Sequence, residues 1–231
     1  MPLPKSKSPP PATAIKTVRS VGRPRSEATR SQILATAIRL LQEQSVQAIT
    51  IEAIAREAGV GKATIYRWWN SKALLVIDAF MENHVVKTPM PRHRSPAEAL
   101  ALHIASIVQE YAGWPGRIVA QIIAEGQSDP DVLREFRERF HYGRRAVVRE
   151  VLQTWCREAD IAAPPNIESL GDLLYAPIYM RLLLGHAPLD EVFVREHLSY
   201  VFTLLGAELP ASLRNAKVVA AGSSPLAAAA V

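Results

Sequence analysis

GVGKATIYRWWNSK, residues 59–72, combines glycines, a lysine and a threonine much as phosphate-binding loops do. A P-loop needs a glycine, four spacer residues and then Gly-Lys-Ser/Thr, so that backbone N–H groups surround the phosphates. In this chain Arg56 occupies the position of the first glycine, and Ala63 stands where the hydroxyl residue should follow Lys62. The preceding segment, residues 51–58, has the apolar spacing of a helix, whereas a P-loop follows a strand. The pattern therefore argues against nucleotide binding.

Two short helices joined by a tight turn are predicted around the same stretch. The first covers residues 51–58, and Gly59 can end it in the left-handed conformation. The second covers residues 62–69, where Ile65 and Trp69 lie four residues apart on one buried face. This arrangement predicts a helix-turn-helix, whose second helix enters the major groove of DNA.

The outward face of the second helix carries groups suited to DNA. Ala63 and Thr64 are short, so the helix start can approach base edges, and Lys62 can donate to guanine O6 and N7. The Tyr66 hydroxyl and the Lys72 ammonium can donate to phosphates that flank the groove. The predicted DNA contacts are Thr50, Lys62, Ala63, Thr64, Tyr66, Arg67, Trp68 and Lys72. The alternative is a buried helical hairpin that never contacts DNA.

The charge distribution favours a polyanion partner at the N-terminal end. Residues 1–87 hold 13 Lys/Arg and 6 Asp/Glu, a net charge of +7, whereas residues 88–231 hold 14 and 16, a net charge of −2. Within VGRPRSE (21–27), Arg23 and Arg25 can lie in a narrow A·T-rich minor groove. The alternative is a solvated basic tail that adds only non-specific attraction.

All periodicity along the chain is helical, so the predicted fold class is all-α. We expect four parts: a disordered basic Pro-rich arm at 1–25, a helix-turn-helix domain at 26–86 that includes a fourth helix, a larger helical domain at 87–208, and a low-complexity tail at 209–231. In the larger domain, helices are expected at about 96–112, 115–126, 129–159, 167–185 and 190–206.

The segment TIEAIAREAGVGKATIYRWWNSKALL (50–75), preceded by RSQILATAIRLL (30–41), resembles the DNA-binding domain of the TetR family of bacterial regulators. The resemblance extends over residues 26–86. It implies phosphate contacts for Thr50, Tyr66, Trp68 and Lys72, and positions that meet bases or neighbouring phosphates for Lys62, Ala63 and Thr64. Trp68 stands where the family commonly has His or Tyr, so its indole is expected either to donate to a phosphate or to pack.

Residues 124–153 and 173–202 resemble a C-terminal class of the same family. The resemblance implies a homodimer built by the last two long helices, which pack against their counterparts as a four-helix interface. It also implies an effector pocket among the central helices, with aromatic wall candidates Tyr111, Trp114, Phe140, Trp155, Tyr175 and Tyr179. The alternatives are a monomeric core and aromatic side chains that only fill it.

The sequence gives little support for catalytic or metal chemistry. The six histidines are dispersed, and no G-x-S-x-G or paired-carboxylate pattern occurs. Cys156, the single cysteine, lies on a predicted helix with both apolar and charged residues, and it is expected to be buried. The charge-rich RERFHYGRR (137–145) is expected to be a solvated helix face, with a salt bridge at the domain junction as the alternative. We predict no enzyme activity, no cofactor and no metal.

The hydropathy of the chain and its family resemblance lead to predictions of compartment and function. No apolar run reaches the roughly 18 residues of a membrane span, and the Pro-rich N-terminus lacks the apolar core of a secretory signal. We expect a cytoplasmic, nucleoid-associated protein without a membrane partner.

As the resemblance implies, the predicted function is a homodimeric repressor that binds a near-palindromic operator in double-stranded DNA and is released by a small-molecule effector. The alternatives are an architectural or partner-controlled DNA-binding factor, and an all-α enzyme or small-molecule carrier.

Overall fold

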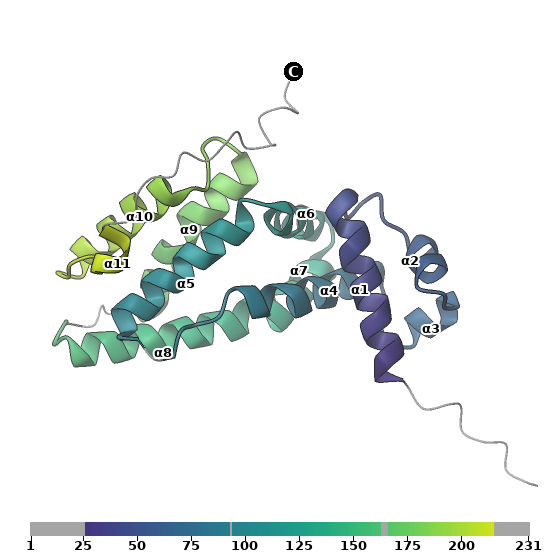
Figure 1. Ribbon diagram of the computed structural model, residues 1–231, viewed down its shortest axis with the longest axis horizontal. Coiled ribbons are helices and arrows are strands. Elements are labelled where there is room, and N and C mark those ends of the chain that lie inside the picture. The colour runs from purple at the N-terminus through teal and green to yellow at the C-terminus, as the bar shows by residue number, and fades with distance from the viewer. Residues whose placement is uncertain (1–25, 93, 163–165, 215–231) are drawn as a thin grey trace, which may run out of the picture.

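The computed structural model describes residues 26–92, 94–162 and 166–214, and every regular element in these ranges is a helix (Figure 1). The N-terminal helices are α1 (Glu27–Glu43), α2 (Ile51–Glu57), α3 (Lys62–Tyr66) and α4 (Lys72–Lys87). The remaining helices are α5 (Pro96–Tyr111), α6 (Trp114–Ser128), α7 (Pro130–Phe136), a π-helical turn (Arg137–His141), α8 (Tyr142–Glu158), α9 (Ile167–Leu184), α10 (Glu191–Leu204) and α11 (Ala211–Arg214). The all-α prediction is confirmed.

Local signals set the helix boundaries. Side-chain oxygens accept hydrogen bonds from the first backbone N–H groups of α1, α2, α4, α5, α7, α9 and α10, and the capping residues are Ser26, Thr50, Ser71, Ser95, Asp129, Asn166 and Asp190. Gly59 follows α2 with a φ of 63°, the left-handed conformation expected for it. Its turn places α3 directly after α2.

Helix α4 joins the two parts of the molecule. It contacts α1, α5, α6, α7 and the π-helical turn, and its Asp78 pairs with both Arg30 of α1 and Arg139 of the π-helical turn, at 3.7 and 2.9 Å. In Figure 1 the α2–α3 pair lies at one end of an elongated molecule, and α10 and α11 lie at the other. The segment after α3 leads into α4, and the indole N–H of Trp69 donates to Asp78 of that helix at 2.9 Å.

The predicted helix 62–69 is shorter in the structure, because α3 ends at Tyr66. The N–H groups of Trp68 and Trp69 both donate to the carbonyl of Ile65, at 2.9 and 3.0 Å. A carbonyl shared in this way closes the last turn and ends the regular helix. The turn still buries Ile65 and Trp69, as predicted.

The predicted helix 129–159 is interrupted by the π-helical turn. A four-residue series of positions faces the core here: Val132, Phe136, Phe140, Val148, Leu152 and Cys156 are buried, and Arg144, between Phe140 and Val148, is half-buried. A straight α-helix has 3.6 residues per turn, so positions four apart drift around its surface by about 40° at each step. In the π-helical turn the Tyr142 N–H donates to the Arg137 carbonyl, five residues back, and the wider turn offsets part of this drift.

The described structure continues past residue 208, the predicted end of the larger domain. Residues 209–214 include α11, and the Leu213 side chain is buried against the core. Arg214 also pairs with Glu208 at 2.8 Å. Residues 215–231 lie outside the described ranges, as does the arm at 1–25.

Candidate DNA-binding surface and central cavity

The orientation of α3 is fixed by its buried side. Ile65 is fully buried, and Trp69 is 2% exposed while its indole N–H donates to Asp78 at 2.9 Å. At the turn before α3, the Val60 N–H donates to the Ala55 carbonyl at 2.9 Å. With one side of α3 held in the core, its opposite side faces solvent.

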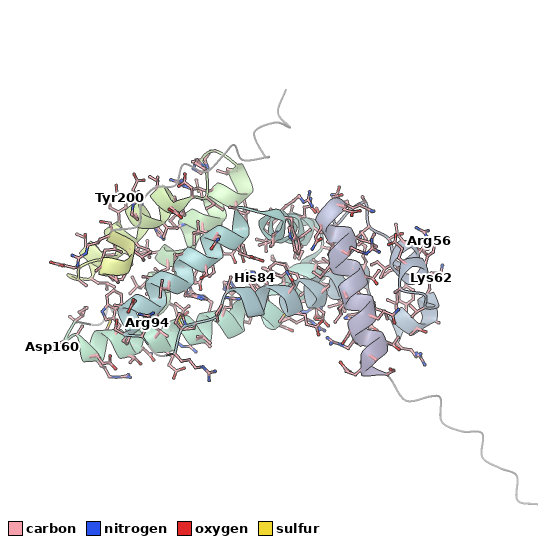
Figure 2. All side chains as sticks on the ribbon, in the orientation of Figure 1. Arg56, Lys62, His84, Arg94, Asp160 and Tyr200 are labelled. Atoms are coloured by element: carbon pink, nitrogen blue, oxygen red, sulfur yellow. The ribbon has the colours of Figure 1, made fainter. Side chains whose placement is uncertain are left out.

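Most of the predicted DNA contacts lie on this solvent side. Thr50, Lys62, Ala63, Tyr66 and Arg67 are exposed, and Thr64 is half-buried. Figure 2 shows Lys62 and Arg56 at the end of the molecule that carries α2 and α3. Arg56, an exposed residue of the last turn of α2, adds a cation that the sequence reasoning did not include. The surface thus presents small, hydroxyl and basic groups together, the combination suited to a DNA groove.

Three predicted contacts are engaged within the chain. Lys62 pairs with Glu52 at 3.0 Å, and hydrogen bonding to that carboxylate raises the pKa of the lysine. The Lys72 ammonium donates to the Val46 carbonyl at 2.8 Å. Trp68 packs partly buried against the core, with its ring centroid 6.2 Å from that of Trp69. Both lysines therefore already have partners within the chain.

Polar contacts tie this surface to the larger domain. Asp78, on α4, accepts from Trp69 and from Arg139 of the π-helical turn, the latter at 2.9 Å. Arg117 of α6 donates to the carbonyls of Leu41 and Gln42 at 3.0 and 2.9 Å, next to the end of α1. The alternative of a salt bridge at the domain junction is confirmed by Arg139 and Asp78.

Four of the six aromatic candidates meet in the larger domain. Tyr111, Phe140, Tyr175 and Tyr179 line a small cavity together with Arg144. The other two do not line it: Trp155 packs on Phe202 with ring centroids 4.6 Å apart, and Trp114 contacts the core at the start of α6. Burial raises the pKa of Tyr111, Tyr175 and Tyr179, so these hydroxyls stay protonated.

A larger cleft of about 990 Å³ adjoins this cavity and shares Phe140 and Arg144 with it. It runs between the segment that links α4 to α5 and one side of α8. His103 lies in its wall, where the ring Nδ1 is 3.3 Å from the Pro89 carbonyl and Nε2 is 3.2 Å from the Tyr175 hydroxyl. The carbonyl can only accept, so Nδ1 donates to it, and Nε2 accepts from the tyrosine. Burial, helped by the Arg144 charge, lowers the pKa of His103 to about 4.

The prediction of a solvated face for residues 137–145 is wrong for Phe140, Arg144 and Arg145. Phe140 is buried, and Arg145 pairs with Glu168 and Asp172 at 3.0 and 2.9 Å. Arg144 falls in the four-residue series of buried positions, between Phe140 and Val148. The four-residue spacing of apolar residues could have predicted that Arg144 faces the core. The many charged residues around it made that spacing difficult to recognise.

Arg23, Arg25 and His93 lie outside the described ranges. Cys156 is buried, as predicted. In the described part of the chain, no three His, Cys, Asp or Glu side chains gather as metal ligands would, and no helix there combines the length and apolar character needed to cross a membrane.

Comparisons with known proteins cover both parts of the chain. Residues 33–79 match the family model described as bacterial regulatory proteins, tetR family, and residues 90–201 match the model described as tetracyclin repressor-like, C-terminal domain. The chain is 33% identical over 175 residues to YdeS, an uncharacterized HTH-type transcriptional regulator of Bacillus subtilis (strain 168), covering 76% of this chain and 88% of that protein.

Solved structures show the same fold. The TetR family transcription regulator SCO0332 superposes with a TM-score of 0.66 at 28% identity, covering 79% of this chain and 99% of that one. The regulator FadR from Bacillus subtilis, solved in complex with stearoyl-CoA, gives a TM-score of 0.60 at 17% identity, covering 74% and 96%. The helix-turn-helix, the family matches and the relatives agree: the chain belongs to the TetR family and is a DNA-binding transcriptional regulator.

Proposed function

We propose that the protein is a homodimeric repressor that binds a near-palindromic operator and leaves it when a small molecule enters the larger domain. Each subunit places its α3 in one major groove, through the contacts predicted from Thr50 to Lys72. The observation that carries the proposal is an exposed apolar face on α9 and α10, at a distance from α2 and α3 (Figure 1).

This face is built by apolar side chains that point away from the core. On α9, Leu173, Met180 and Leu184 are exposed at helical spacing, Leu184 to 64% of its surface. Other positions around the same helix, Leu170, Leu174 and Ile178, are buried. A helix that is apolar nearly all round is expected to be covered on more than one side.

Helix α10 continues the same kind of surface. Tyr200 is 75% exposed and Leu204 67% exposed, while Phe193, Val194 and Leu198 of the same helix are buried. Figure 2 places Tyr200 at the end of the molecule remote from Lys62. A second copy packed on this face by twofold symmetry covers apolar surface and leaves both α2–α3 pairs free for DNA.

The cleft supports control by a small molecule. Its volume of about 990 Å³ lies within the range of sites for small organic ligands. A DNA-binding factor without an effector would be expected to have a tightly filled larger domain. A ligand shifts the protein off DNA only if it binds the released conformation more tightly than the DNA-bound one. The link from the cleft through Arg139 and Asp78 to Trp69 is one route for that coupling.

The dimer test uses Leu184→Glu combined with Tyr200→Glu. The wild-type chain should sediment as a dimer, and the double variant as a folded monomer with at least about tenfold weaker affinity for a selected inverted-repeat duplex. Tyr142→Glu is the matched control, because Tyr142 is 55% exposed but lies on α8. A wild-type monomer, or a double variant that stays dimeric, would reject the α9–α10 interface.

The sign of regulation needs a separate test. In a reporter strain whose promoter overlaps the selected duplex, the wild-type chain should lower transcription. Arg67→Ala together with Tyr66→Phe should restore it. Higher transcription with the wild-type chain would instead identify an activator.

A further inference from the structure

Arg144 is a cation at a position where the helix otherwise buries apolar side chains. Its guanidinium lies 5.3 Å from the Phe140 ring centroid, and burial lowers its pKa. Among the residues that the structure describes, no carboxylate pairs with it, and its Nε has no hydrogen-bond partner. By contrast, Arg139 pairs with Asp78, and Arg145 pairs with Glu168. A partly desolvated cation without a counter-ion is a costly feature unless an anion uses it.

The guanidinium lines both the small aromatic cavity and the larger cleft. On one side it meets the small cavity of Tyr111, Tyr175 and Tyr179, and on the other it meets the cleft of about 990 Å³. Apolar side chains of the cleft wall include Met81, Met90, Val147 and Val151. The carboxylates in the wall, Glu150 and Glu158, come later on α8, about 9 and 21 Å along the helix axis from Arg144 at 1.5 Å per residue.

We propose that the effector is an amphipathic organic anion whose acidic group binds the Arg144 guanidinium and whose apolar body lies along the cleft. This inference rests on the proposed function, because it assigns a chemical class to the effector. A guanidinium offers two parallel N–H donors to a carboxylate or similar oxyanion, in a geometry that neutral ligands do not match.

The present partners of Arg144 connect this site to α4. Its guanidinium donates to the Thr88 carbonyl at 3.1 Å and also to the Thr88 hydroxyl. That hydroxyl in turn lies 3.1 Å from the His84 carbonyl, in the last turn of α4. An anion bound to Arg144 competes with Thr88 and loosens the end of the helix that carries the DNA-binding part.

The test compares two fluorescent probes of the same ring system. 8-Anilino-1-naphthalenesulfonate carries a sulfonate, and N-phenyl-1-naphthylamine is its uncharged analogue. Wild-type protein should bind the anionic probe saturably. Arg144→Met should weaken that binding by about tenfold or more and leave the neutral probe unaffected or tighter. Arg144→Lys, which keeps the charge, should give an intermediate loss and provides a second variant if the first does not fold.

Arg149→Met is the matched control, because it removes the same charge from α8 at a residue that pairs with Glu168 and lies outside the cleft wall. An equal loss in this control would assign the effect to general attraction and overturn the proposal. So would unchanged binding of the anionic probe by both Arg144 variants, or a wild-type protein that does not bind it.

The two proposals fail in different ways. Release from the selected duplex is measured in parallel by fluorescence anisotropy. If a neutral compound releases the protein while Arg144 is irrelevant to the anionic probe, effector control stands and the anion site fails. If the anionic probe binds through Arg144 but leaves DNA affinity unchanged, the anion site stands and its role in effector release fails.

Discussion

The helix-turn-helix and the central cavity are assembled from the chain in opposite ways. The DNA contacts predicted for the helix-turn-helix fall within residues 50–72, a span that holds the short helices α2 and α3 and the start of α4. The cavity wall instead takes Tyr111 from α5, Phe140 from the π-helical turn, Arg144 from α8 and Tyr175 from α9. A motif built by neighbouring residues shows its chemistry in the sequence, whereas a site built by distant helices becomes visible only once those helices pack.

The tandem tryptophans Trp68 and Trp69 test the account of the helix-turn-helix, and their substitution should give the largest change in stability. Trp69→Ala removes a buried ring and its hydrogen bond to Asp78, so we expect the free energy of unfolding to fall by about 3–5 kcal/mol. Trp68→Ala removes a partly buried ring and should cost about 1 kcal/mol or less of stability. Chemical denaturation of both variants measures the difference. Equal losses would contradict the division into one core and one surface tryptophan.

His103 lies in the wall of the larger cleft, 3.2 Å from the Tyr175 hydroxyl of the small cavity, and tests this region through the pH dependence of stability. Its folded pKa of about 4 lies below the unfolded value of 6.5, so the unfolded chain binds the extra proton first as pH falls. The stabilisation is complete above about pH 6.5 and is lost towards pH 4, by about 3 kcal/mol at 1.36 kcal/mol per pH unit.

His103→Gln should flatten this part of the pH dependence of stability. His186, an exposed histidine beyond the end of α9, is the control position, as His186→Gln. The same pH dependence in wild type and in His103→Gln would show that the ring is not held neutral.

The phosphate contacts test how far local chemistry determines affinity. Tyr66→Phe combined with Lys72→Ala should weaken DNA binding by about 2 kcal/mol for every sequence, because each lost group donates to a phosphate in the proposal. The dependence of log K on log salt should become shallower by about 0.9, for the one charge removed. Fluorescence anisotropy across a salt series measures both quantities, with Arg149→Ala as a charge control far from α3. Unchanged affinity would remove these two residues from the interface.

Glu52 should give the smallest effect and in the opposite direction. Its exposed ion pair with Lys62 stabilises little, but the carboxylate competes with DNA for the lysine. Glu52→Gln should tighten DNA binding a few-fold, and Glu43→Gln, at the end of α1, should not. Weaker binding by Glu52→Gln would indicate that the pair positions Lys62 for its base.

Much of the helix-turn-helix domain could be predicted from short stretches of sequence. Thr50 caps α2 and Gly59 takes the left-handed conformation because neighbouring residues alone decide these features. Helical spacing likewise predicted the burial of Ile65 and Trp69. The bond from Lys72 to the Val46 carbonyl escaped prediction, since it joins residues 26 positions apart.

The larger domain was predicted less completely, for a related reason. The π-helical turn arises from packing, because buried positions four residues apart must stay on one side of a long helix. Arg144 stands in a charge-rich segment that the sequence does not divide into buried and exposed arginines, and its bond to Thr88 spans 56 positions. Trp155 resembles the other aromatic candidates in sequence, and only the approach of Phe202 separates it from the cavity.

The most direct measurement is the selection of binding sites from a random duplex library by the purified protein at near-physiological salt. The account predicts enrichment of an inverted repeat whose half-site centres lie about 34–36 Å apart, or at a related multiple. Enrichment should be lost in the Leu184→Glu, Tyr200→Glu variant. No enrichment by the wild-type chain, or capture of A·T-rich DNA without symmetry, would contradict a sequence-specific dimer and favour an architectural factor.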